Sequence, residues 1–210
     1  MTQGTPVTLD EITARLEAYT EKYTSLIGEI LQADGGNGYP ADFMVLPLLN
    51  RSTKLVSGFL TLIKEQNYLC AIPLIRLQLD NALRYYATAL VDNPDGLVLD
   101  FLKGKPINKM KDRKHQQMRD GYLADQLNKE LPGVKSIYTS TSGYVHLSDK
   151  HFFVTITPSG KDAGRMKFGN GPDLFTLVDR INFVNQMVQC SEVVYRLIEE
   201  WKNFKQNKTQ

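Results

Sequence analysis

The stretch IPLIRLQLDNALRYYA, residues 72–87, decides the fold of this chain. Its apolar side chains fall on most sides of a helix, a pattern typical of a helix that other helices surround. We therefore expect a helix from about Ala71 to Val91 at the centre of an α-helical body. Within it, Arg76 and Asp80 lie one turn apart, a spacing that allows them to form an ion pair.

A strong helix signal comes earlier in the chain. Thr8 and Glu11 have the spacing of a capping box, in which each side chain bonds the backbone amide of the other residue. Apolar residues then recur at alternating spacings of four and three as far as the glycine-rich run 34–38, which predicts one long amphipathic helix. The same type of pattern predicts a helix over about 47–66 and a last helix from about 172 to 201.

The rest of the chain predicts smaller elements. Residues 97–131 indicate a looser connector with one or two short helices. Apolar and polar residues alternate on both sides of a glycine-containing turn within residues 151–169, which predicts a small β-hairpin. We therefore expect an all-α, up-and-down helical bundle with an appended hairpin. It should form a single domain over residues 1–205, followed by a polar tail at residues 206–210.

Composition excludes several classes of protein. The chain has 210 residues, of which 42% are hydrophobic and 23% charged, as in ordinary soluble globular proteins. No apolar run approaches the roughly 18 residues that span a membrane, and the N-terminus lacks the pattern of a secretory signal. We expect a cytoplasmic protein without membrane contact. The cysteines and histidines lack the spacing of a metal site, so we expect neither a metal nor a cofactor.

A local excess of positive charge lies within residues 103–119, although the net charge of the whole chain is only +2. Seven basic residues in this segment accompany a single acid, Asp112. A solvated connector is one interpretation, and a patch that binds RNA or another polyanion is the alternative. The candidate patch consists of Lys109, Lys111, Arg113 and Lys114.

The segment YTSTSGYVHLS, residues 138–148, carries the strongest indication of a polar site. Read as a helix, it places Tyr138, Ser142 and His146 on one stripe, at i, i+4 and i+8. Burying such groups without partners costs roughly 1–3 kcal/mol each, so the stripe predicts a polar centre shared with another helix. His146 is either a hydrogen-bonded structural residue or a group that contacts a ligand or takes part in catalysis.

Two segments resemble a known family. In a group of uncharacterised microbial HEPN-like proteins, one helix has the pattern alanine, two residues, Leu-Leu-Arg and then an acid. Residues 67–86 resemble that helix. Residues 138–148 resemble that group's helix with tyrosine, three residues, serine, two residues and Val-His. The resemblance covers about residues 45–150 and implies a bundle in which two helices face each other, one with Arg76 and Asp80, the other with Tyr138, Ser142 and His146.

HEPN domains include metal-independent ribonucleases of toxin and phage-defence systems as well as non-catalytic binding modules. In the ribonucleases, an arginine lies four to six residues before the histidine of one helix. Those positions before His146 contain Ser140 and Thr141 but no arginine. The missing arginine favours a non-catalytic module that binds a ligand or a partner. The apolar stripes of the first and last helices exceed what a thin bundle readily buries, so we also expect a homodimer or larger homo-oligomer. The alternative is a ribonuclease or defence effector in which Arg76 binds phosphate and His146 acts as acid or base.

Overall fold

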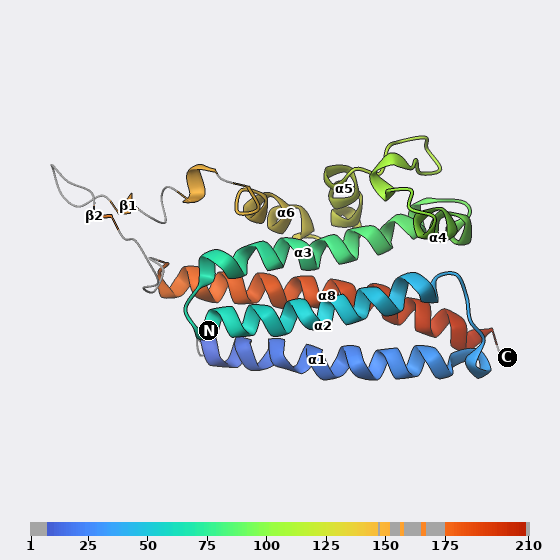
Figure 1. The fold of residues 1–210 in the computed structure, drawn as a ribbon, viewed down its shortest axis with the longest axis horizontal. Helices are drawn as coiled ribbons and strands as arrows, with labels where there is room; N and C mark the ends of the chain where they lie inside the picture. The colour runs from blue at the N-terminus through green and yellow to red at the C-terminus, as the bar shows by residue number, and fades with distance from the viewer. Residues whose placement is uncertain (1–7, 147, 152–155, 158–164, 167–174, 209–210) are drawn as a thin grey trace, which may run out of the picture.

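Four long helices lie side by side in the computed structural model, which describes residues 8–146, 148–151, 156–157, 165–166 and 175–208 (Figure 1). Helices α1 and α3 each pack against both α2 and α8, so that α1 lies diagonally opposite α3. The expectation of an all-α bundle is confirmed. The four helices are α1 (Leu9–Gln32), α2 (Asp42–Lys64), α3 (Tyr68–Tyr86) and α8 (Leu177–Asn207).

Helix α1 forms as its sequence predicts. The Thr8 hydroxyl accepts a hydrogen bond from the Glu11 amide, and the Glu11 carboxylate accepts one from the Thr8 amide at 2.8 Å. The helix ends in the 3₁₀ turn η1 (Ala33–Gly36), where Gly35 has a φ of 64°, in the left-handed region that glycine enters without strain. The predicted apolar seam is buried along its whole length: Ile12, Leu16, Tyr19, Tyr23, Leu26 and Ile30.

The topology departs from the expected up-and-down order at the last helix. Tyr19 of α1 contacts Glu192 of α8, and Glu29 further along α1 contacts Lys202 further along α8, so these two helices are parallel. Helix α8 also runs parallel to α3 (Figure 1). The short helices between α3 and α8 lead the chain back along the bundle, and therefore α8 starts at the same end as α1 and α3.

Helices α2 and α3 both begin earlier than expected. Helix α2 starts at Asp42 rather than Pro47, and α3 starts at Tyr68 rather than Ala71. The Asn67 side chain accepts a hydrogen bond from the Cys70 amide and so caps α3. After Tyr86 the helix tightens into the 3₁₀ turn η2 (Ala87–Leu90). The central position predicted for α3 is confirmed, because it packs against α2, α8 and the short helices.

The connector after α3 contains two short helices, as expected for about residues 97–131. They are α4 (Pro94–Leu102) and α5 (Asp120–Glu130). The 3₁₀ turn η3 (Ile107–Lys109) lies between them, and α6 (Val134–Ser142) follows. Helices α5 and α6 pack on α3 and on each other, outside the four-helix bundle (Figure 1).

A buried ion pair joins three parts of the chain at one end of the bundle. Lys205, near the end of α8, is 1% exposed and donates hydrogen bonds of 2.9 Å to the Asp42 carboxylate and to the Ile30 carbonyl. Asp42 also accepts hydrogen bonds from the Trp201 indole and from the Tyr39 amide. Helix α8 continues to Asn207, so the first two residues of the expected polar tail are helical.

The expected hairpin falls mostly outside the described residues. Strand β1 (Ile156–Thr157) and strand β2 (Arg165–Met166) pair in antiparallel orientation, with Ile156 opposite Met166. The remainder of the hairpin therefore stays a prediction. The last helix begins at Leu177 rather than at about residue 172, and the Thr176 side chain caps it by accepting a hydrogen bond from the Asp179 amide.

Candidate functional site

Arg76 binds the two short helices to α3. Its guanidinium lies 3.0 Å from the carboxylate of Asp120 on α5 and 4.5 Å from the centre of the Tyr138 ring on α6. Its side chain is only 11% exposed. The structure thus brings Arg76 and Tyr138 together, as expected. It does not pair Arg76 with Asp80, so that expectation was wrong, because the start of α5 supplies a different carboxylate.

Asp80 pairs with two other arginines. Its carboxylate lies 3.1 Å from Arg84 on α3 and 3.5 Å from Arg51 on α2. Arg84 also reaches Asp120 at 2.6 Å, so one aspartate at the start of α5 bridges two arginines of α3. We call Arg51, Arg76, Asp80, Arg84 and Asp120 the arginine cluster.

Helix α6 ends before it can carry the predicted stripe to His146. Its last residue is Ser142, and His146 lies in an exposed bend four residues later. The hydroxyls of Thr139, Thr141 and Ser142 all donate to carbonyls of their own helix. Such side chains compete with helical backbone bonding, and Gly143 follows them, which accounts for the early end. The helical alignment predicted for His146 is therefore wrong.

A buried polar chain crosses the bundle and was missed by the sequence analysis. The Gln78 amide donates hydrogen bonds to the Tyr23 hydroxyl at 2.9 Å and to the Ser191 hydroxyl at 3.3 Å. The Asn81 amide donates to Ser52 at 2.8 Å and to Gln78 at 3.3 Å. These groups join all four bundle helices. Two amide side chains three residues apart, Gln78 and Asn81, on a helix with a largely apolar sequence were the available signal.

This chain leads outward to a pocket of about 400 Å³ between α2, α3 and α4. The oxygen of the Asn81 side chain accepts a hydrogen bond from Arg51, which lies at the pocket. Atom Nη1 of Arg84 is buried and has no hydrogen-bond partner among the described residues. The pocket is lined by Met44, Pro47, Leu48, Arg51, Asp80, Asn81, Arg84 and Phe101.

The two guanidiniums give the pocket its chemical character. Arg51 and Arg84 accompany a single acid, Asp80, in its lining, and charge-assisted hydrogen bonds from arginine are among the strongest in proteins. The Arg51 side chain is 43% exposed, so a bound oxyanion can accept such bonds from it. The lining of the pocket therefore suits an anion.

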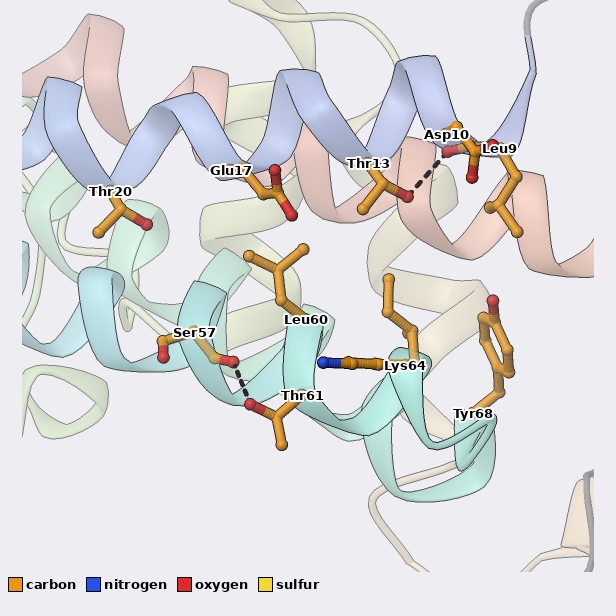
Figure 2. A pocket seen from close by; sticks show the side chains of 11 residues that line it. Leu9, Asp10, Thr13, Glu17, Thr20, Ser57, Leu60, Thr61, Lys64 and Tyr68 are labelled. Atoms are coloured by element: carbon orange, nitrogen blue, oxygen red, sulfur yellow. Dashed lines mark hydrogen bonds between the residues drawn. The ribbon is translucent and has the colours of Figure 1, made fainter.

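A groove of about 500 Å³ between α1 and α2 is a weaker candidate (Figure 2). Thr13 and Thr61 line it, but their hydroxyls donate to the carbonyls of Leu9 and Ser57 at 2.8 and 3.0 Å. Leu60 points from α2 toward α1 in the same view. The ionised side chains that line the groove are those of Asp10, Glu17 and Lys64, so acids outnumber bases there and the groove suits an anion less well than the arginine pocket.

The four residues of the predicted basic patch are all exposed, but they do not act alike. Arg113 donates hydrogen bonds to the carbonyls of Ala89, Leu90 and Val91, so it closes the end of η2. Lys109 and Lys111 line a separate pocket of about 550 Å³ beside α4. Lys114 remains at the surface, so three lysines of the patch stay available to a polyanion.

Asp112 organises this basic segment from within. Its carboxylate accepts hydrogen bonds from the amides of Lys114 and Gln116 at 2.9 and 2.8 Å, and from the Tyr122 hydroxyl. Burial raises the pKa of Asp112, but the hydrogen bonds from Tyr122 and the two amides outweigh burial, so the net pKa is below its ordinary value. The contact with Asp112 in turn raises the pKa of Tyr122 to about 12.

The described residues show neither a metal-ligand group nor a membrane-spanning helix. Within the described residues, no group of three or more histidine, cysteine, aspartate or glutamate side chains is arranged to hold a metal ion. No helix in the described ranges has both the length and the apolar character needed to cross a membrane. Comparison of the chain with family models, with curated proteins and with solved structures finds no match.

Proposed function

We propose that this protein is a non-catalytic binding module that holds a small anion in the pocket between α2, α3 and α4. The observation that carries the proposal is the surplus of guanidinium over carboxylate groups in the lining of that pocket, where Arg84 and Arg51 accompany the single acid Asp80. Arg51, from the facing helix, supplies a second guanidinium. Two guanidiniums from different helices favour an oxyanion, because each presents several donors in a planar fork.

The charge of the arginine cluster supports an anionic ligand. Three guanidiniums, of Arg51, Arg76 and Arg84, share two carboxylates, of Asp80 and Asp120. The cluster therefore has one positive charge in excess among the described residues. Its side chains are between 11% and 43% exposed, so water screens this charge only in part.

The proposal is tested by thermal unfolding in acetate, phosphate or sulfate against chloride at constant ionic strength. An oxyanion at ten times its Kd should add about 1.4 kcal/mol of stability. For a domain of this size that raises Tm by roughly 3–5 °C. Arg51→Gln should lose this gain. Lys54→Gln makes the same charge change at an exposed residue one turn away, which does not line the pocket, and should keep it.

Equal responses of wild type and Arg51→Gln to every oxyanion would remove the proposal. Arg51 is the better residue for this test, because its side chain is 43% exposed. Arg84 bridges Asp80 and Asp120, and its replacement would also disturb the packing of α5 on α3.

The ribonuclease or defence-effector alternative, including a HEPN-like relationship, is less well supported. Arg76 is occupied by Asp120 and by the Tyr138 ring, and His146 is exposed beyond the end of α6. The observation in its favour is the exposed Lys109, Lys111 and Lys114, which suit the RNA backbone. RNA cleavage without added metal that His146→Ala abolishes would favour this alternative.

A further inference from the structure

The pocket between α2, α3 and α4 has two chemically different sides. Arg51, Asp80, Asn81 and Arg84 form its polar side, whereas Met44, Pro47, Leu48 and Phe101 form its apolar side. The Phe101 side chain belongs to a residue that is 38% exposed, so a large ring lies open to solvent at the pocket. An exposed aromatic ring beside a pocket is a surface that a ligand's apolar part can cover.

On the polar side of the pocket, the hydrogen-bond acceptors are already bonded, whereas donors remain available. The two carboxylate oxygens of Asp80 contact Arg84 and Arg51. The Asn81 oxygen accepts from Arg51, and its nitrogen donates to Ser52 and Gln78. The Arg51 side chain is 43% exposed, so its guanidinium stays accessible from the pocket beyond these contacts. A ligand is therefore recognised through its acceptors, since the acceptors of the pocket are already engaged.

The excess charge and the volume limit the ligand further. One surplus positive charge in the arginine cluster is balanced by a monoanion, whereas a dianion would reverse the sign of the cluster. A planar carboxylate also matches the guanidinium fork. A volume of about 400 Å³ is ample for more than the carboxylate alone and lies in the range of small-molecule sites.

Building on the proposed anion site, we infer that its ligand is an amphipathic monocarboxylate. The carboxylate contacts Arg84 and Arg51, and the aliphatic or aromatic body of the acid lies against Met44, Leu48 and Phe101. The polar chain through Asn81, Gln78 and Tyr23 holds the site in place from inside the bundle. The free acid is thus recognised at both ends, by charge and by apolar surface.

The test measures the affinity of the full chain for acetate, butanoate, hexanoate and octanoate by isothermal titration calorimetry, below the micelle concentration of each. Each buried methylene contributes about 0.8 kcal/mol, so affinity should rise roughly fourfold per methylene until the pocket is filled. Octanol should not bind at matched concentrations because it lacks the charge. Octyl phosphate should bind no more tightly than octanoate.

Two variants separate the two ends of the ligand. Phe101→Ala should reduce the gain in affinity per methylene. Phe43→Ala removes another exposed ring, on α2, that does not line the pocket, and should leave the gain unchanged. Arg51→Gln should weaken the whole series, whereas Lys54→Gln should not.

The possible failures are distinguishable. Acetate and octanoate binding with equal affinity would overturn the amphipathic ligand and leave the anion site standing. Octyl phosphate binding more tightly than octanoate would overturn the carboxylate in the same way. Octanol binding as tightly as octanoate, or no response to any oxyanion, would overturn both this inference and the proposed function.

Discussion

At the scale of single residues, the buried pair of Lys205 and Asp42 is the contact whose loss should cost most. Asp42→Ala leaves a lysine that is 1% exposed without its carboxylate, and breaking a buried pair in this way costs about 3–5 kcal/mol. We expect chemical denaturation to show a loss of that size. Asp10→Ala, a matched control in the first turn of α1 at an exposed position, should cost at most about 1 kcal/mol.

A double variant makes this prediction sharper. Asp42→Ala combined with Lys205→Met removes both charges, so no unpaired ion remains and much of the lost stability should return. If Asp42→Ala alone is as stable as wild type, the lysine finds another partner or reaches water, and the account of the buried pair fails.

Sequence reasoning grouped some residues that lie together but did not identify their partners. Arg76, Asp80 and Tyr138 lie in or against the arginine cluster, whereas His146 is exposed beyond the end of α6. Sequence reasoning did not identify Arg51 or Asp120, because the contacts that join them to α3 span 29 and 44 positions in the chain. Helical spacing predicts neighbours within one helix, whereas partners across helices depend on packing that the spacing does not encode.

At the scale of elements, Asp120 should control how firmly α5 is held to α3. It accepts charge-assisted hydrogen bonds from Arg76 and Arg84, which are typically worth about 1.5–3 kcal/mol. We expect Asp120→Asn to accelerate hydrogen exchange across α5 (Asp120–Glu130) while the bundle helices keep their protection. Asp125→Asn on the same helix removes a more exposed pair with Lys135 and should have little effect. Unchanged exchange in Asp120→Asn would contradict this role.

The predictability of each element followed the strength of its end signals. Helix α1 was predicted closely because a capping box starts it and glycines end it. Helix α6 was extended too far, because helical periodicity continues through Gly143 although the preceding hydroxyls weaken the helix. The capping box of Thr176 and Asp179 at the start of α8 was available in the sequence but was overlooked in favour of Pro172.

At the scale of the whole molecule, exposed apolar side chains on α4 favour self-association, which the sequence analysis also expected. Leu99 and Leu102 lie one turn apart and are 45% and 50% exposed. Covering them with a second copy of the chain would remove apolar surface from water. We expect light scattering at micromolar concentration to give twice the monomer mass of 23.8 kDa.

The surface that carries this association is identified by substitution. Leu99→Glu with Leu102→Glu should return the protein to the monomer, because charged groups at a buried contact have a high desolvation cost. Leu31→Glu introduces one glutamate at another exposed leucine, 55% exposed at the end of α1, and should leave the dimer intact. A wild-type mass of 23.8 kDa would count against self-association at these concentrations. Dissociation by Leu31→Glu but not by the α4 variant would instead place the interface at the C-terminal end of α1.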